Sequence, residues 1–382
     1  MAVRVDVNPE LYVWASERSR LDRDELVAKF PKLNEWEAGE VKPTLRQLES
    51  FATATRTPVG YLFLDDPPDE ELPIPDFRTF ADGPIARPSP DLLDTIYHAQ
   101  QRQEWFIGYA ARNGFEELAW VGSMTLETPI TEAAATMSEA LRFGVEERGT
   151  TWSNAFQTLC QHTEEVGVLV MVNGVVGSNT HRKLRPDEFR GFALVDPMAP
   201  IVFVNGADTK AAQIFTLSHE IAHVWLGQTG LDNASPGDRA HGDVEAWCNR
   251  TAAELLVPLA ELQDQYDALA PLADEMNRLA RRYKVSTLVI LRRIQEAGHL
   301  TWHDFRAAYL AELELVIARA EERTGEGGNF YNTQPVRVSK TFARAVIADT
   351  LAGSTTYTNA FRMLGVRKSS TFTQLAEHLA AG

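Results

Sequence analysis

The chain has few of the features that would place it outside a cell or in a membrane. Its 382 residues include only two cysteines, Cys160 and Cys248, which are too few for a disulfide framework. No run of about 18 apolar residues occurs, so we expect no membrane-spanning segment. The N-terminus also lacks the long apolar stretch of a signal peptide. We therefore expect a cytoplasmic protein with no membrane partner.

Positive charge is also scarce. The chain carries 37 Lys and Arg against 53 Asp and Glu, a formal net charge of −16. This balance argues against a protein that coats nucleic acid with its whole surface, although it allows a local basic patch. A hydrophobic content of 44% over this length favours a sizeable core and two or three domains.

Changes of pattern along the chain predict a predominantly helical α+β protein. Short β-rich stretches at 166–176, 192–195 and 201–205 precede two helices, at 209–225 and 244–256. We expect a small sheet and these helices to form the core, with all-helical modules on both sides. The expected domains are a helical module at 1–66, a linker and long helix at 67–125, the core with a trailing helical segment at 126–300, and a helical module with a basic tail at 301–382.

A pair of histidines four residues apart forms the clearest chemical motif. His219 and His223 lie in the strongly helical run FTLSHEIAHVWL. Residues four apart share a helix face, with about 5–6 Å between their Cβ atoms, so both imidazoles can reach one tetrahedral Zn²⁺ ion. Glu220, one step around the helix, suits a general base that takes a proton from an attacking water without binding the metal.

A catalytic zinc site needs a third protein ligand and one open position. The second predicted helix offers Glu245, which we expect to complete the ligand set. The spacing resembles that of gluzincin peptidases, in which an Asp four residues after the ligand Glu orients one metal-binding histidine. Asn249 stands in that position here, and its carbonyl can still accept a hydrogen bond from an imidazole. The alternative is a helix whose histidines are polar surface residues.

The two motifs together resemble the ImmA/IrrE family of bacterial metallopeptidases. Members show HExxH at the end of a helix and then E-x-x-x-N-x-x-A-x-x-L-L-x-P, a pattern that EAWCNRTAAELLVP at 245–258 fills. The resemblance covers about residues 160–300. It implies a zinc-dependent endopeptidase of α+β build that cuts or controls a partner regulator, and it leaves the substrate open.

Residues 34–63 resemble the second half of a Cro/repressor-type helix-turn-helix. Only 11 residues separate Leu26 from Glu37, about four fewer than the intact motif needs, and Pro31 falls where the recognition helix should run. Residues 1–60 carry nine Lys and Arg against ten Asp and Glu, which gives no basic footprint. A degenerate module that docks a partner or inhibits the chain is favoured, with DNA reading as the alternative.

Two later regions are locally basic. Residues 277–293 carry six Lys and Arg and no acid, and residues 335–382 carry six against two acids. Arg281, Arg282 and Lys284 are the candidate contacts to nucleic acid or to an acidic partner. A solvated helix face explains the same charges equally well.

The layout as a whole resembles a subgroup of these proteins encoded beside PIN-type ribonuclease toxins. It shares a PIPDFRT-like linker at 73–79 and a tail containing GGNFYNTQ at 327–334. The resemblance implies an antitoxin or regulator role. Two functions are therefore carried forward. One is a zinc metallo-endopeptidase that acts on a regulatory protein partner in a toxin–antitoxin, stress or mobile-element response. The other is a non-proteolytic antitoxin-like transcriptional regulator or binding module in which zinc is structural.

Overall fold

The computed structural model describes residues 3–76, 87–232, 242–321 and 330–381, with side chains described for all of these except 317–332 and 381. Contacts divide the chain into two compact units. The first is Met1–Pro73 with Asp82–Tyr97, and the second is Ile74–Ala81 with His98–Gly382. The boundary near residue 97 falls inside one continuous helix.

The N-terminal unit is a group of short helices around its own core. Its elements are α1 (Pro9–Ser19), α2 (Arg23–Lys29), α3 (Leu33–Glu37), α4 (Leu45–Ala54), the 3₁₀ helix η1 (Val59–Phe63) and the start of α5 (Pro90–Arg112). A capping box between Thr44 and Gln47 fixes the start of α4. Tyr12, Trp36 and Phe51 pack edge to face or tilted in a buried aromatic cluster. This unit therefore has a hydrophobic core separate from that of the rest of the chain.

The second unit contains the remaining elements. In chain order these are α6 (Ile130–Ala140), η2 (Val145–Glu147), α7 (Trp152–Glu165), β1 (Leu169–Asn173), β2 (Val175–Val176), β3 (Asn179–Lys183), β4 (Gly191–Leu194), β5 (Ile201–Asn205), α8 (Lys210–Leu226), β6 (Gly230–Asp232), α9 (Asp243–Leu256), α10 (Leu259–Gln265), α11 (Leu272–Tyr283), α12 (Thr287–Glu296), α13 (Trp302–Glu321), α14 (Phe330–Val338), α15 (Lys340–Leu351), α16 (Tyr357–Leu364) and α17 (Ser369–Ala381).

A four-stranded mixed sheet organises this unit, with strand order β1-β5-β4-β6. β1 runs parallel to β5, with Leu169 opposite Ile201, and β4 is antiparallel to both β5 and β6. β2 and β3 form a separate small hairpin. The outer edge of β6 pairs with a short segment from earlier in the chain. The N–H of Leu231 donates to the carbonyl of Pro75 at 2.9 Å, and Asp76 forms a parallel bridge with Leu231.

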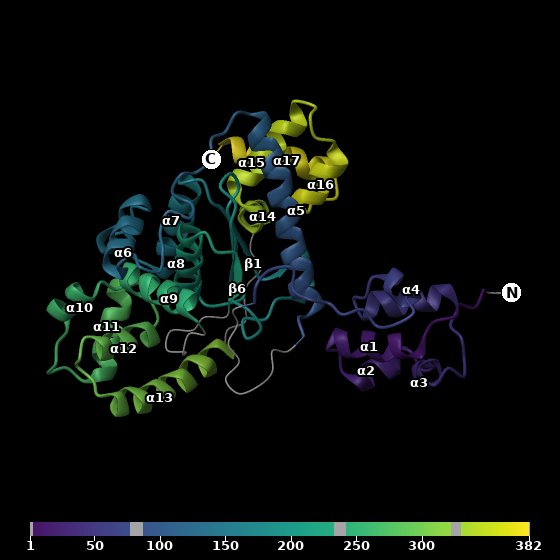
Figure 1. Ribbon diagram of the computed structural model, residues 1–382, viewed down its shortest axis with the longest axis horizontal. Helices are drawn as coiled ribbons and strands as arrows, with labels where there is room; N and C mark the ends of the chain where they lie inside the picture. The colour runs from purple at the N-terminus through teal and green to yellow at the C-terminus, as the bar shows by residue number, and fades with distance from the viewer. Residues whose placement is uncertain (1–2, 77–86, 233–241, 322–329, 382) are drawn as a thin grey trace. The chain divides into compact units, whose positions relative to one another are not determined.

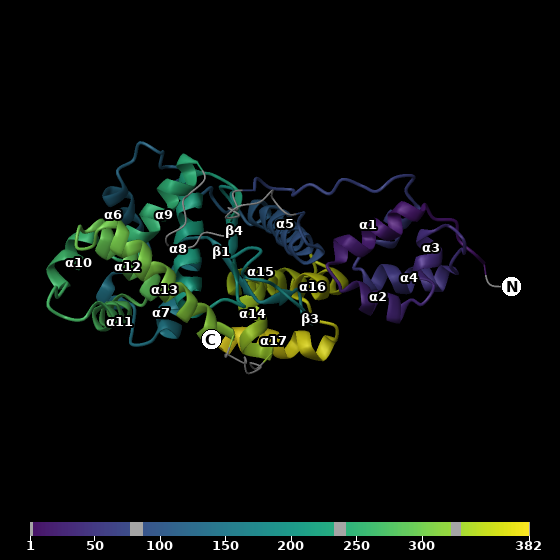
Figure 2. The ribbon, with the colours of Figure 1, turned by 90° about the horizontal axis from the view of Figure 1, so that it is seen from below.

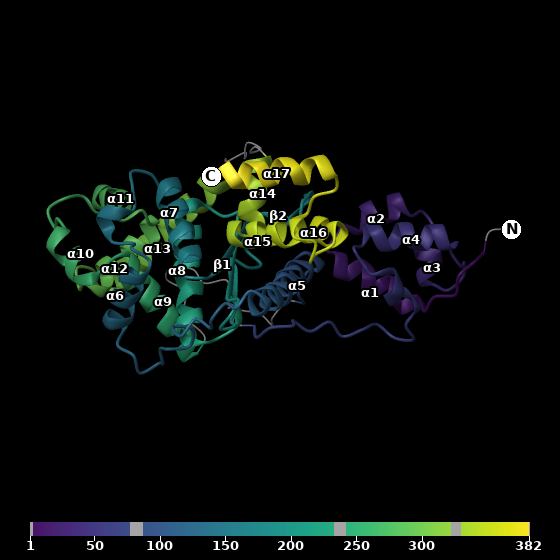
Figure 3. The same ribbon diagram turned by 90° about the horizontal axis from the view of Figure 1, so that it is seen from above.

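The sheet lies between α8 on one side and α5 and α14 on the other (Figure 1). Every residue of α8 from Gln213 to Leu226 is buried, as expected of a helix surrounded on all sides. α8 packs on β4 and β5 and against α7 and α9. Figures 2 and 3 show α14 to α17 gathered into one group beside the second half of α5.

The structure confirms the predicted fold class, a predominantly helical α+β protein. The strand expected at 201–205 is β5, and the helices expected at 209–225 and 244–256 are α8 and α9. The polar, glycine-containing sequence of 227–243 favours a loop, but the stretch includes β6. In the described parts of the chain, no helix has both the length and the apolar character needed to cross a membrane.

Candidate metal centre

The helix α8 presents the HExxH motif from a well-defined segment. The hydroxyl of Thr209 accepts from the N–H of Ala212 at 3.2 Å and caps its start. Gly227, with φ of 73°, ends it in a left-handed turn that favours glycine. His219, Glu220 and His223 each expose only 1% of their surface. The motif is therefore part of the buried core, and the alternative of surface histidines does not hold.

The helix α9 brings a carboxylate to the same place. Glu245 lies in the first turn of α9, just after Gly242, and is 2% exposed. Its two oxygens lie 3.3 Å from His219 Nε2 and 3.1 Å from His223 Nε2. The two Nε2 atoms are 3.0 Å apart. Two helices thus bring one donor atom each from three side chains into a single cluster.

These distances suit a shared metal ion. Bonds of about 2.0–2.2 Å to a tetrahedral ion place neighbouring ligand atoms about 3.3 Å apart, close to the spacing found here. Two imidazole nitrogens and one carboxylate oxygen also form the donor set of a catalytic zinc site with an open position. Burial alone would raise the pKa of Glu245, but hydrogen bonds and charge from His219 and His223 outweigh it and hold the pKa below its ordinary value. The carboxylate is therefore in the charged form that binds a cation.

Glu220 lies against the sheet and does not belong to the ligand cluster. A Cβ atom added to Gly191 of β4 would fall 2.8 Å from Glu220 Oε1 and 2.5 Å from the methyl group of Thr216. The missing side chain of Gly191 therefore makes the space in which the Glu220 carboxylate lies. Sequence reasoning missed Gly191, because only the packing of α8 on β4 reveals its neighbour.

Three other candidate residues lie near the motif in the sequence, and the structure treats each of them differently. Cys248, interpreted as a core residue in preference to a ligand, is fully buried. Asn249 lies one turn after Glu245, and its Oδ1 is buried without a hydrogen-bond partner among the described residues. Its role in orienting an imidazole stays a prediction. His241, considered as a substrate contact, lies outside the described residues.

The basic residues predicted as nucleic-acid or partner contacts lie elsewhere, on α11 and in the turn before α12. Arg282 pairs with Glu261 at 3.0 Å and with Glu146 at 3.1 Å. Arg281 is exposed, and Lys284 ends α11 while donating to the carbonyl of Arg281. Three further arginines of 277–293 pair with glutamates, namely Arg278, Arg292 and Arg293. Ion pairs therefore offset much of the positive charge of this region.

An α+β core with two histidines and a glutamate from neighbouring helices around one point has the arrangement of a metallopeptidase site. Residues 163–295 match the family model described as the IrrE N-terminal-like domain. This match supports the ImmA/IrrE family for the segment that contains α8 and α9. Residues 338–378 match a second model, described as a domain of unknown function (DUF8813).

Two curated proteins are similar to part of the chain. The radiation response metalloprotease IrrE of Deinococcus deserti is 30% identical over 138 residues, which cover 35% of this chain and 46% of that protein. The radiation response metalloprotease IrrE of Deinococcus radiodurans is 32% identical over 96 residues, or 24% of this chain and 29% of that protein. The matches thus span less than half the length of either relative.

Proposed function

We propose that this protein is a zinc-dependent endopeptidase, with His219, His223 and Glu245 as metal ligands and Glu220 as the general base. The observation that carries the proposal is the cluster of three buried donor side chains, in which the two Nε2 atoms are 3.0 Å apart and each lies 3.1–3.3 Å from one oxygen of Glu245. The similarity to two proteins named as metalloproteases supports the same activity. Zinc is proposed over other metals because imidazole and carboxylate ligands in this number are typical of catalytic zinc.

In this proposal a bound zinc ion would act as a Lewis acid that polarises the scissile carbonyl of the substrate. Glu220 takes a proton from the attacking water and then donates it to the leaving amine, which completes the hydrolysis. The space beside Gly191, which has no side chain, accommodates the Glu220 carboxylate next to the metal-ligand histidines of the same helix and supports this role. Enclosure of these side chains in the core strengthens the electrostatic interactions on which the reaction depends.

The experiment compares the wild type with Glu220→Gln, a change that removes the base but keeps the side-chain shape. We expect near-stoichiometric zinc in both proteins, measured by mass spectrometry of the metal without chelators. Cleavage of a partner protein should fall by a factor of about 10² to 10⁴ or more in the variant. A wild type that purifies without metal, or a variant that cleaves at the wild-type rate, would overturn the proposal.

We further propose that the substrate is a regulatory protein and that the N-terminal unit recruits a partner rather than reading DNA. Helix α3 is only five residues long, and its Leu33 and Trp36 are buried in the core of the unit. The same helix carries Glu35 and Glu37, whose charges oppose a phosphate backbone. The layout of the chain resembles that of proteins encoded beside PIN-type toxins. A toxin of this type is therefore the first partner to test.

The competing function is a non-proteolytic regulator in which zinc stabilises the fold. It predicts that Glu220→Gln keeps full biological activity, and that a captured partner keeps its length during incubation. The endopeptidase proposal predicts the opposite in both assays. A cleaved partner with wild-type protein and an intact partner with Glu220→Gln would decide for the enzyme.

A further inference from the structure

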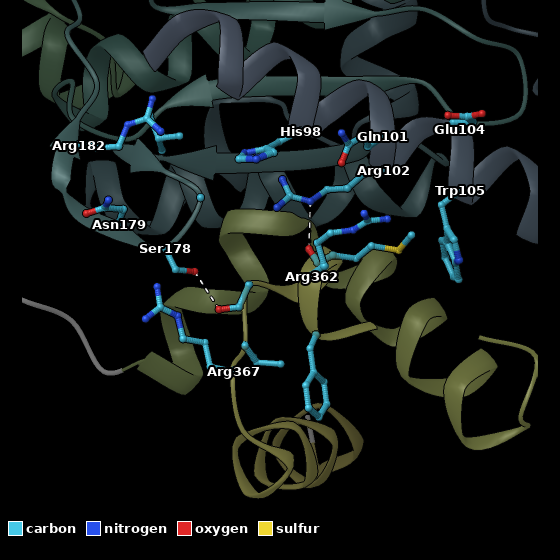
Figure 4. Close-up of a pocket in the computed structure, with 16 residues that line it drawn as sticks. His98, Gln101, Arg102, Glu104, Trp105, Ser178, Asn179, Arg182, Arg362 and Arg367 are labelled. Carbon is cyan, nitrogen blue, oxygen red and sulfur yellow. Dashed lines mark hydrogen bonds between the residues drawn. The ribbon is translucent and has the colours of Figure 1, made fainter. Parts of the chain in front are cut away.

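A cavity of about 880 Å³ lies in the second unit and is not lined by any of the metal-centre residues. Three parts of the chain form it: the second half of α5, the β2–β3 hairpin, and α16 with the turn that follows. Figure 4 shows polar side chains from all three parts around the space. Those used in the argument are His98, Gln101 and Arg102 from α5, Ser178, Asn179 and Arg182 from the hairpin, and Arg362 and Arg367 from the third part.

The charge of this cavity is opposite to that of the protein. Four guanidinium groups line it and only one carboxylate, that of Glu104, so arginines outnumber acids in its wall. The whole chain has a formal net charge of −16. Such a concentration of arginines from distant segments favours an anionic ligand with several charges.

Of the four guanidinium groups, that of Arg102 is the best placed to bind an anion. Its Nε donates to the carbonyl of Met363 at 3.2 Å, and its Nη1 lies 3.8 Å from the sulfur of Met171. Burial lowers the pKa of Arg102 to about 10, so it remains a cation at neutral pH. Within the described residues it has no carboxylate partner. Arg102 is half-buried, and a partly desolvated cation without a counter-charge is stabilised by a bound anion.

Arg362 and Arg367 complete the basic wall from the C-terminal helices. Both are exposed, and the structure pairs neither with an acid in the described parts of the chain. A guanidinium presents a planar fork of donors that matches the oxygens of a phosphate group. Asn179 adds a neutral amide donor, whereas the hydroxyl of Ser178 already donates to the carbonyl of Gly365 at 3.1 Å.

Aromatic rings supply an apolar surface in the same cavity. Trp105 lines it, and its ring is fixed by stacking on Tyr109 at 5.3 Å and by a hydrogen bond from its Nε1 to Thr355 at 3.2 Å. Phe361 lines another part of the wall. Rigid aromatic side chains next to arginines are the means by which proteins hold a nucleobase beside its phosphates.

We propose that this cavity binds a nucleoside diphosphate or triphosphate, with the phosphates held by Arg102, Arg362 and Arg367 and the base against the aromatic wall. The volume fits a ligand of this size, since small-molecule sites span about 300–1,000 Å³. The phosphates would balance the charges of Arg102, Arg362 and Arg367, for which the described residues provide no carboxylate partner. A single cavity on which the arginines converge suits a compact ligand better than the extended phosphate track of a nucleic acid.

Binding should also join two parts of the second unit. The arginines at 362 and 367 belong to the segment 338–378, whereas Arg182 belongs to the hairpin inside the segment 163–295. A ligand that contacts both stabilises the packing of the C-terminal helices on the core. The thermal midpoint of unfolding therefore reports binding as directly as calorimetry does.

The test measures ADP and ATP binding to the full-length protein by isothermal titration calorimetry and thermal unfolding. We expect saturable binding, and a rise in Tm of about 3 °C at a hundredfold excess over Kd. The double variant Arg362→Glu/Arg367→Glu, at exposed positions that should tolerate substitution, should weaken binding by more than about tenfold. Arg344→Glu is the matched control, because Arg344 is exposed on α15 and does not line the cavity.

Further ligands and one variant separate the alternatives. The variant His219→Ala should bind ADP as the wild type does, which shows that the nucleotide is not held by a metal at the other site. No binding of ADP or ATP at millimolar concentration, or equal binding by the double variant, would overturn the proposal. Equal affinity for pyrophosphate and ADP would overturn the nucleoside assignment, and tighter binding of a single-stranded oligonucleotide would assign the cavity to nucleic acid.

Discussion

At the scale of single residues, Gly191 and Glu220 show how the backbone prepares the site. Gly191 begins β4, and Glu220 lies on α8, the helix that packs on this strand. A methyl group on Gly191 would meet Glu220, Thr216 and the carbonyl of Phe203 at 2.5–2.9 Å. The carbonyl belongs to β5 and cannot move without disturbing the sheet. The position of Glu220, the proposed general base, therefore depends on a residue that has no side chain.

We predict that Gly191→Ala lowers both stability and peptide cleavage. Overpacking of this kind costs about 1–3 kcal/mol in the free energy of unfolding, and displacement of Glu220 should reduce the cleavage rate while zinc content stays near wild type. Urea unfolding, a cleavage assay and metal analysis measure the three quantities. Gly60→Ala is the control, because a Cβ at Gly60 meets nothing within 4 Å. A fully stable and active Gly191→Ala protein would contradict this account.

At the scale of elements, Arg148 connects the ends of two helices. Its guanidinium is buried and donates to the carbonyls of Leu255 and Leu256, at the end of α9, at 2.9 and 2.5 Å. It also donates to the carbonyl of Tyr283, the last residue of α11, at 2.9 Å. Carbonyls at helix ends have no partner within the helix and carry partial negative charge. One arginine thus satisfies the ends of α9, which carries Glu245, and of α11.

Replacement of Arg148 by Met should destabilise the protein strongly. The apolar side chain fills a similar volume but leaves several buried carbonyls without donors, which we expect to cost roughly 3–5 kcal/mol. Urea unfolding monitored by circular dichroism gives the free-energy change. Arg344→Met, at an exposed position on α15, should change it by less than about 0.5 kcal/mol. Equal effects of the two substitutions would show that the carbonyl contacts contribute nothing.

The elements differ in how far the sequence predicts them. The caps of α8, Thr209 and Gly227, are local signals, and so the helix and its histidine spacing could be predicted. β6 has only three residues, and its partners lie far along the chain, so no local pattern marked it. The same holds for Arg282, whose partners Glu261 and Glu146 are 21 and 136 residues away. Charge counted along 277–293 could not show this neutralisation.

At the scale of the whole molecule, the proposed metal centre joins α8 and α9 and should stabilise the fold. Zinc that binds the folded but not the unfolded chain adds free energy that grows with its concentration. Removal of zinc with a chelator should therefore lower Tm by several degrees, and added zinc should restore it. His223→Ala should have a low Tm that a chelator does not change. A wild-type Tm that changes with neither chelator nor added zinc would contradict the proposed centre.

The pairing of the segment 74–76 with β6 has a consequence for association between chains. An open edge strand offers its N–H and C=O groups to any other chain and so promotes aggregation. Here the N–H of Leu231 is already bonded to Pro75, and this proline of the added segment has no N–H to give. A second copy that approached this side of the sheet would find a row of donors interrupted by proline. This edge of the sheet is therefore protected against extension into a larger intermolecular sheet.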